Sequence, residues 1–489
     1  MVTISMIETA LYILLYVLYI VFVAYLIIKL IVAKHDPVKS ITWIMIMFII
    51  PVIGVILYLS VGKNLRRKKK KHRKNSLKIN KYFEKLVIKQ KFAITVPSMK
   101  GTRQLTDNKK IVNLLFNNNV SPITINNEVI VLNNGVETFP KIKEELNKAK
   151  IFIHLEYYII ENDIIGNEIA DILIKKAKEG VEVRLIFDDV GSWHITKKYV
   201  KRLTQGGVLV EPYQPVIFSK LANSLNYRNH RKLINIDGLI SFTGGLNIAD
   251  RYIYGTKKIG TWRDTHIMIK GGASLALQAL FANDWYNCHG EILDDAKYTP
   301  SPESIKNQCA IQIASSGPNS EWASIMQAFF SVITKAKNHI YISTPYFIPG
   351  NSILTAIKVA AMSGVDVKIM LPHKSDTNIT YYATRSYIDE LLETGVKIYF
   401  YKPGFNHSKI IMADSNVVTV GTANMDVRSF EQNLEVTAII YDEKTTKEVE
   451  EHFLNDLNFC DRIYEQEWNK RRNIEHLYEG LTRLFSPIL

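Results

Sequence analysis

Two stretches of the chain repeat one pattern of polar residues within apolar sequence. Residues 229–237 read NHRKLINID and residues 244–247 read GGLN, while residues 406–414 read NHSKIIMAD and residues 421–424 read GTAN. In both copies Lys follows His by two positions, Asp follows Lys by five, and Gly and Asn follow His by fourteen and seventeen. The second histidine lies 177 residues after the first. This repeated spacing predicts two related halves.

The spacing also predicts where the side chains of each copy point. Side chains alternate along a strand, so a His and a Lys two positions apart share one face. The apolar residues that follow predict a buried strand, and the glycine turn lets the backbone bring Asn back beside His. An approximate twofold axis between the halves would gather six groups around one phosphate: His230, Lys232, Asn247, His407, Lys409 and Asn424.

These six groups suit the cleavage of a phosphodiester. Lysine and asparagine donate hydrogen bonds to the non-bridging oxygens and stabilise the charge of the transition state. One neutral imidazole can attack phosphorus and form a phosphohistidine, while the other, protonated, donates a proton to the departing alkoxide. Their opposite protonation states require different surroundings. Because lysines supply the positive charge and no Asp, Glu and His cluster has metal-site spacing, we expect no metal and no other cofactor.

The pattern lies within a longer repeat of alternating strand and helix signals. Strand-like residues 151–160 and 181–187 correspond to residues 340–348 and 365–371, with an amphipathic segment between the two runs in each copy. This alternation predicts an α/β fold.

The double motif resembles that of the phospholipase D superfamily, in which H-x-K-x(4)-D followed by G-x-x-N occurs twice. Other stretches resemble bacterial cardiolipin synthases: VGKN at 61–64, IHLEYY at 153–158, WRDTH at 262–266 and FSPIL at 485–489. The resemblance implies two phospholipase D-like α/β sandwich halves around one active site, preceded by a two-helix transmembrane hairpin. It further implies a cardiolipin synthase, which reversibly transfers a phosphatidyl group between two phosphatidylglycerol molecules, forms cardiolipin and glycerol, and passes through a phosphohistidine.

The resemblance favours His230 as the nucleophile and His407 as the general acid and base, with the reverse assignment left open. The alternatives for the activity are another phospholipase D-type lipid hydrolase or transphosphatidylase, a membrane-tethered nuclease, and a catalytically silent scaffold. The intact motif residues argue against the scaffold. Because no pattern of a nucleic-acid-binding module is found, we expect no nucleic-acid partner. The expected partners are phosphatidylglycerol, cardiolipin and an anionic lipid surface, and no pattern sets the oligomeric state.

Four carboxylates belong to the predicted site. Asp237 and Asp414 are part of the motif and are counted with the catalytic residues, although a structural carboxylate at the strand end is the favoured interpretation. Further carboxylates should orient the imidazoles. Asp264 and Glu435 are candidates because they follow the motif histidines by similar intervals, 34 and 28 residues.

The composition favours an anionic partner and a reducing compartment. The 489-residue chain has a formal net charge of +14 and a sequence pI of about 9.3. Such a balance suits a membrane surface with anionic headgroups, or nucleic acid. The three cysteines, Cys288, Cys309 and Cys460, are scattered, which argues against a disulfide framework and against a zinc site.

The N-terminal residues predict a membrane anchor. Residues 9–28 and 41–62 carry no charge, and each stretch is long enough to cross a hydrocarbon core of roughly 30 Å. No basic region precedes the first stretch, which disfavours a signal peptide. Ten Lys and Arg residues follow in residues 63–78, and the positive-inside rule places them and the catalytic region on the cytoplasmic side of a multi-pass cell-membrane protein.

The expected organisation therefore has five parts. The C-terminal one is either a helix packed on the core or an interfacial helix on the membrane. The parts are two transmembrane helices in 1–62, a basic connector and entry region in 63–134, the first repeat in 135–305, the second repeat in 306–442 and a helical segment in 443–489.

Overall fold

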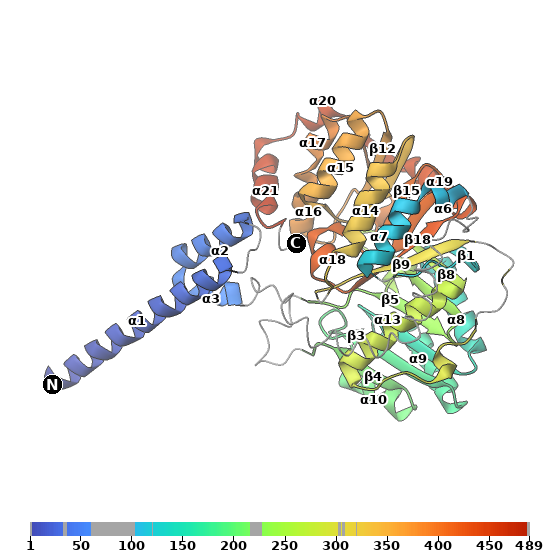
Figure 1. The fold of residues 1–489 in the computed structure, drawn as a ribbon, viewed down its shortest axis with the longest axis horizontal. Coiled ribbons are helices and arrows are strands. Elements are labelled where there is room, and N and C mark those ends of the chain that lie inside the picture. Colours follow the sequence, from blue (N-terminus) through green and yellow to red (C-terminus); the bar gives the residue numbers. More distant parts are fainter. Residues whose placement is uncertain are drawn as a thin grey trace. The chain divides into compact units, whose positions relative to one another are not determined.

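The fold is taken from a computed structural model that describes residues 2–32, 37–59, 103–119, 121–215, 227–301, 305, 309–318 and 320–486. The chain divides into two compact units (Figure 1). The first comprises Met1–Leu65 and Val216–Asn226, and the second comprises Arg66–Pro215 and Tyr227–Leu489. The described strands all belong to the second unit.

The first unit contains one helix that is long and apolar enough to cross a membrane. Helix α1 (Val2–Val32) includes the apolar segment Glu8–Val32, whose mean hydropathy reaches 2.7. Leucines of α1 pack against the two helices that follow, in a small core of Leu26, Leu30, Met47, Val55 and Tyr58. The basic residues 63–78 lie outside the described residues.

The second apolar stretch does not form one continuous helix in its described residues. Helix α2 (Pro37–Ile49) ends two residues before Pro51, where a short helix α3 (Pro51–Leu57) begins. Proline has no N–H to donate and its ring clashes with the preceding turn, so the helix breaks. Gly54 permits close packing of the two pieces, because a Cβ there would lie 2.4 Å from the carbonyl oxygen of Ile46. The predicted pair of spans is therefore not confirmed, and among the described residues only α1 qualifies as a span.

The second unit contains two large sheets with the same strand order, besides two small sheets of two strands each. The first is β1-β8-β6-β5-β2-β3-β4, and the second is β9-β18-β16-β15-β10-β12-β13 with β19 added at its edge. The first sheet is formed by β1 (Asn127–Asn133), β2 (Phe152–Tyr157), β3 (Glu182–Asp188), β4 (Leu209–Tyr213), β5 (Lys232–Ile236), β6 (Ile240–Gly244) and β8 (Thr265–Gly271). The second is formed by β9 (Ala310–Ser316), β10 (His339–Ser343), β12 (Asp366–Pro372), β13 (Lys397–Tyr401), β15 (Ile410–Ala413), β16 (Val417–Gly421), β18 (Glu435–Tyr441) and β19 (Cys460–Ile463).

Strand directions match between the two sheets. In the first, β2, β3 and β4 run parallel, and β5, β6, β8 and β1 continue antiparallel to their neighbours. In the second, β10, β12 and β13 are parallel, followed by antiparallel β15, β16, β18 and β9. Equivalent helices also end alike, at Gly180 and Gly364 with φ of 93° and 92°, where glycine is free of Cβ strain. The duplication read from the sequence is thus present in the fold.

Helices cover the outer faces of both sheets, and the inner faces share one core. The helices of the first half are α8 (Asn134–Lys148), α9 (Ile164–Lys178), α10 (Lys197–Gln205), α12 (Arg251–Tyr254) and α13 (Gly272–His289). Those packed with the second half are α6 (Arg103–Asp107), α7 (Lys109–Asn119), α14 (Ser324–Lys335), α15 (Gly350–Met362), α16 (Asn378–Arg385), α17 (Ile388–Leu392), α18 (Val427–Glu431), α19 (Glu443–Leu457), α20 (Glu465–Trp468) and α21 (Asn473–Arg483). The shared core joins residues of β5 and β8 to residues of β15, β16 and β18, and it includes residues of α13 and α19. Because both faces of the central strands are covered, their residues are buried throughout.

The segments before and after the duplication complete the two halves. Strand β1, which lies in the predicted entry region, pairs with β8 of the first sheet, and α7 packs into the core of the second half. Strand β19 of the C-terminal segment pairs with β13, so that segment is not wholly helical. Helix α21 buries Glu479 but exposes Leu477 and Leu481, so it packs on the body with one face and presents an apolar face to solvent. The three cysteines are free thiols.

Candidate active site

Backbone hydrogen bonds fasten each motif histidine to the opposite half of the duplication. The amide of His230 donates to the carbonyl of Leu434 at 2.9 Å, and Asn229 forms a parallel bridge with Leu434. In the equivalent place, β14 (Gly404–Asn406) pairs in parallel with β7 (Thr261–Arg263), and the amide of His407 donates to the carbonyl of Arg263 at 2.7 Å. The two histidines are therefore held at the junction of the halves.

The same register places a carboxylate against each imidazole. Glu435 follows Leu434 and its oxygens lie 2.9 and 3.0 Å from Nδ1 of His230. Asp264 follows Arg263 and its Oδ2 lies 2.8 Å from Nδ1 of His407. Both carboxylates are fully buried. The intervals along the chain made these two residues candidates to orient the imidazoles. Each of them contacts the histidine of the other half rather than that of its own half.

The charged groups of the two motifs act on one another. Burial lowers the pKa of His230 to about 4, against the opposing effect of Glu435, and Lys232 and Lys409 lower it further. Burial also places the pKa of His407 well below its ordinary value, and Lys409, Lys232 and His230 add to that effect. Since charged groups of each half perturb the imidazole of the other, the two histidines and the two lysines lie close enough to act on one another.

Both motif lysines are buried and turned back toward their own histidines. Lys232 Nζ donates to the carbonyl of His230 at 2.8 Å, and Lys409 Nζ donates to that of His407 at 2.5 Å. Burial lowers the pKa of Lys232 to about 7 and that of Lys409 to about 8, although Glu435 and Asp264 oppose the shift. At pH 7 Lys232 is therefore about half charged and Lys409 mostly charged, and both lose their charge at mildly alkaline pH.

The motif asparagines have different partners. Asn247 donates to the hydroxyl of Tyr252 at 2.6 Å and accepts from the amide of Ile159 at 3.1 Å. The buried side-chain oxygen of Asn424 has no hydrogen-bond partner among the described residues. The capacity that Asn424 retains is therefore that of an acceptor, because its side chain also hydrogen-bonds Asp426.

The glycine turns make the two carboxylates chemically different. A Cβ on Gly245 would lie 2.1 Å from Oδ1 of Asp264, so this position admits no side chain. The equivalent residue, Thr422, donates its hydroxyl to Glu435 at 2.5 Å. Burial raises the pKa of Asp264 to about 6. Burial opposes ionisation of Glu435 too, but His230, Lys232 and Thr422 together hold its pKa below the ordinary value.

The motif aspartates lie at strand ends and bind backbone. Asp237 accepts from the amides of residues 150, 151 and 152, each at 2.8 Å, and Asp414 accepts from those of residues 337, 338 and 339 at 2.8 to 3.1 Å. Both have φ of 52°, in the left-handed region that Asp tolerates in tight turns. Counting them among the catalytic residues is not supported by this geometry, because their oxygens are occupied by the start of the neighbouring strand.

Aromatic side chains that the motif does not include line the site. The ring of Tyr158 meets that of His230 edge-on at 4.9 Å, and Lys232 Nζ lies 5.5 Å from the Tyr158 centroid. Phe405 and Trp262 flank His407 at 5.6 and 6.1 Å. The sequence signals for these residues were an aromatic residue directly after β2 and one in the middle of each of the paired strands β7 and β14, but none of them has a fixed motif spacing.

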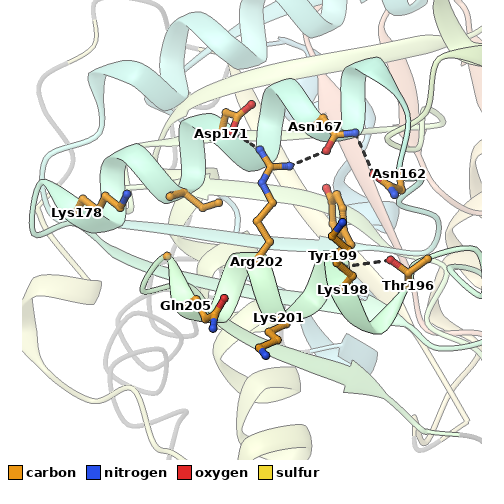
Figure 2. A pocket seen from close by; sticks show the side chains of 12 residues that line it. Asn162, Asn167, Asp171, Lys178, Thr196, Lys198, Tyr199, Lys201, Arg202 and Gln205 are labelled. Atoms are coloured by element: carbon orange, nitrogen blue, oxygen red, sulfur yellow. Dashed lines mark hydrogen bonds and ion pairs between the residues drawn. The ribbon is translucent and has the colours of Figure 1, made fainter.

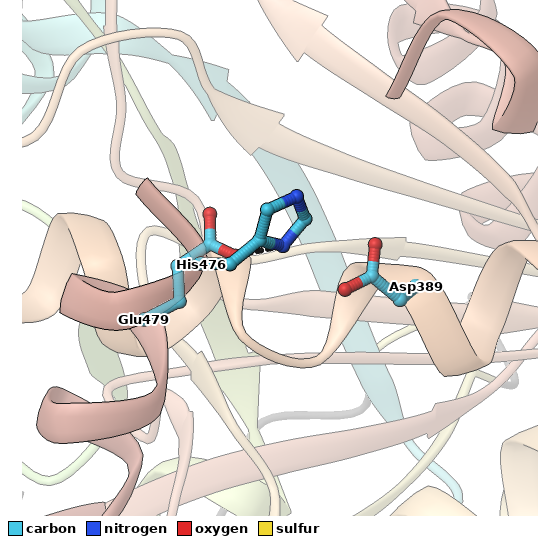
Figure 3. A group of neighbouring side chains, drawn as sticks. All are labelled: Asp389, His476 and Glu479. Atoms are coloured by element: carbon cyan, nitrogen blue, oxygen red, sulfur yellow. Dashed lines mark ion pairs between the residues drawn. The ribbon is translucent and has the colours of Figure 1, made fainter. Parts of the chain in front are cut away.

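One cluster has the composition of a cation site, but its geometry is that of an ion-pair network. Asp389, His476 and Glu479 lie close together where α21 meets α17 (Figure 3). Arg471 donates to both carboxylate oxygens of Glu479 and lies 3.6 Å from Asp389. The guanidinium thus supplies the positive charge that these acids require.

Comparisons with known proteins agree with this architecture. Residues 142–285 and 329–457 match the family model described as cardiolipin synthase, PLD-like domain, and residues 17–63 match that of the phospholipase D-nuclease N-terminal region. A phosphatidylserine synthase of Haemophilus influenzae has the same fold, with a TM-score of 0.59 over 80% of this chain and 100% of its own at 14% identity. The duplicated sheets and the paired histidines thus define a phosphatidyltransferase of the phospholipase D type.

Closer relatives give the family. A cardiolipin synthase of Halalkalibacterium halodurans is 42% identical over 93% of this chain and 90% of its own length. The major cardiolipin synthase of Bacillus subtilis is 41% identical over 93% of this chain and 95% of its own. The chain belongs to the cardiolipin synthase family.

Proposed function

We propose that the chain transfers a phosphatidyl group from one phosphatidylglycerol to another, producing cardiolipin and glycerol through a phosphohistidine on His230. The crossed carboxylate–imidazole pairs carry this proposal. Because Nδ1 of each imidazole is bonded to a carboxylate, each ring has Nε2 left for chemistry, and no described residue bonds to either Nε2. Two such nitrogens suit a nucleophile and an acid on opposite sides of one phosphorus.

His230 is the better nucleophile of the pair. Its pKa of about 4 makes the ring neutral at pH 7, and ionised Glu435 accepts the Nδ1 proton, so the lone pair lies on Nε2. Attack by Nε2 forms the P–N bond while the P–O bond to glycerol breaks. Glu435 then faces the positive imidazole of the phosphohistidine and stabilises it, as the carboxylate of a catalytic triad does for its histidine.

His407 supplies and later removes the proton. A bound phosphodiester adds negative charge beside His407 and offsets Lys409 and Lys232, so its pKa rises toward that of a proton donor. The adjoining Asp264, with its pKa of about 6, is mostly ionised at pH 7, so it stabilises the imidazolium that forms when His407 takes a proton from solvent. His407 Nε2 protonates the departing glycerol oxygen, and then takes the proton of the incoming phosphatidylglycerol hydroxyl as that oxygen displaces His230. One phosphodiester replaces another, so the reaction is reversible.

We further propose that residues 1–62 cross the membrane twice and leave the basic residues 63–78 and the catalytic unit on the cytoplasmic side. The apolar length of α1 and the positive-inside rule support this topology. A single cysteine at Ser76, in a chain whose three native cysteines are replaced by serine, should react with an impermeant maleimide only from the cytoplasmic face. Labelling from the opposite face would contradict the topology.

The reaction predicts a definite product ratio. Purified protein with phosphatidylglycerol should release cardiolipin and glycerol in equal amounts, because each transfer frees one glycerol, and excess glycerol should reverse the reaction. Quantitative lipid and glycerol analysis measures this. Phosphatidic acid as the sole product would mean that water is the acceptor and that the chain is a hydrolase.

An activated donor separates the roles of the two histidines. With phosphatidyl-p-nitrophenol, the leaving group needs no proton, so the His407→Ala variant should release one equivalent of p-nitrophenol and stop as the phosphohistidine. The His230→Ala variant should give no burst. A burst from His230→Ala but none from His407→Ala would reverse the assignment.

The same burst reports on the crossed pairs. Glu435→Gln places an N–H donor against Nδ1 of His230 and forces the proton onto Nε2, so the burst rate should fall by a factor on the order of 10⁴, as for the equivalent change in a catalytic triad. Asp264→Asn, the matched change beside His407, should leave the burst rate within about threefold, since an activated donor needs no acid. Equal losses in both variants would contradict the assignment of Glu435 to His230.

The lowered lysine pKa values predict an alkaline limb in the pH profile. As pH rises through 7 to 8, Lys232 and Lys409 lose their protons and the phosphodiester loses its positive partners, so kcat/KM should fall. Lys409→Arg keeps its charge at high pH, so the part of the fall near pH 8 should disappear while the part near pH 7, which belongs to Lys232, remains. Lys335→Arg, at a lysine bonded to Asn108 instead, is the matched control and should leave the limb in place. An unmoved limb in Lys409→Arg would exclude this lysine as its origin.

A further inference from the structure

The loop after β3 presents an exposed indole at the active-site edge of the first sheet. Trp193 is 77% exposed, although large aromatic side chains are usually well covered in a folded domain. The preceding residue, Ser192, donates its hydroxyl to the carbonyl of Tyr158 at 3.0 Å, and Tyr158 meets His230 edge-on. The Trp193 loop is therefore linked to the imidazole of His230 through Ser192 and Tyr158.

The helix that follows this loop is strongly basic. Residues 190–210 contain four cationic residues and no Asp or Glu. Lys197 and Lys198 form the first turn of α10, beside the positive end of the helix dipole, where cations destabilise a helix. An external anion would relieve this repulsion.

The cations of α10 have two different arrangements. Arg202 reaches across a groove of about 880 Å³ to α9, donates to Asn167 at 2.6 Å and pairs with Asp171 (Figure 2). Its charge is therefore matched within the protein. Lys197, Lys198 and Lys201 are exposed, and no carboxylate of the described residues pairs with them.

We propose that Trp193, Lys197, Lys198 and Lys201 form a docking surface for an anionic phospholipid bilayer. An indole prefers the boundary between headgroups and acyl chains, because its ring is apolar and its N–H is polar. Lysines beside it bind lipid phosphates, and each contributes roughly fivefold to the affinity, which is about 1 kcal/mol. Docking here turns the active-site edge of the first sheet toward the lipid. The surface goes beyond the proposed function, because it contacts lipids other than the reacting ones.

The full-length protein in vesicles tests this surface. Brominated phosphatidylcholine quenches the fluorescence of tryptophans that lie at the bilayer. The difference in fluorescence between the parent chain and Trp193→Phe is the emission of Trp193. The brominated lipid should quench this emission, and more strongly when phosphatidylglycerol is added. The triple variant Lys197→Gln, Lys198→Gln, Lys201→Gln should weaken docking roughly 100-fold, and so abolish the quenching of Trp193.

A control with the same change in charge distinguishes docking from a general loss of positive charge. Lys337, Lys444 and Lys447 are exposed near the opposite ends of the strands, where β10 begins. Their triple change to Gln should leave the quenching of Trp193 as in the parent chain, and thermal unfolding in detergent checks that both variants are folded. Iodide quenching of Trp193 without any effect of brominated lipid would overturn the proposal. The proposal would also be overturned if the lipid quenched Trp193 equally in the parent chain and in the Lys197→Gln, Lys198→Gln, Lys201→Gln variant. An equal loss of quenching in both triple variants would have the same meaning.

Discussion

The hydrogen bond between each imidazole and a buried carboxylate of the opposite half is the contact on which the site depends. It follows from backbone pairing, because Leu434 and Arg263 accept the amides of the two histidines and the next residue in each case is the carboxylate. A shift of either pairing by one residue would turn that carboxylate to the other face of its strand. The shared core between the sheets fixes this register, since the central strands of both halves contribute to it. Core packing, strand pairing and proton chemistry are therefore parts of one arrangement.

Symmetry of the backbone does not extend to the electrostatics. Gly245 lies against Asp264 and gives it no hydrogen bond, whereas Thr422 in the same position donates to Glu435. Glu435 thus remains an anion beside His230, while the pKa of Asp264 rises to about 6 beside His407. A reaction that needs one basic and one acidic imidazole requires this kind of inequality. A single difference in the glycine turn contributes to it without disturbing the fold.

Much of this architecture could be read from the amino acids. The spacing from His to Asn reports a strand, a turn and a returning strand, which are local and nearly independent of the remainder of the chain. The crossed partners could not be read in the same way, because Glu435 and Asp264 lie 205 and 143 residues from the histidines they contact. The spacing between a histidine and a carboxylate within one half does not predict which residue of the other half will contact that histidine. Strands β1 and β19 were missed for a related reason, since edge strands are defined by the sheet that receives them. At the N-terminus, hydropathy located both apolar stretches, but Pro51 and Gly54 decided the shape of the second.

The crossed pairs also bear on ancestry. Two separate copies of one half, associated about a twofold axis, would make the same two contacts, because each copy would lend its carboxylate to the histidine of its twin. In such a symmetric assembly both imidazoles would have identical surroundings until a substrate bound. Fusion into a single polypeptide removes that symmetry, and each half is then free to drift on its own. The difference between Gly245 and Thr422, which occupy equivalent positions, is what such independent change leaves behind. The two halves share one backbone plan, yet their histidines differ before any substrate binds.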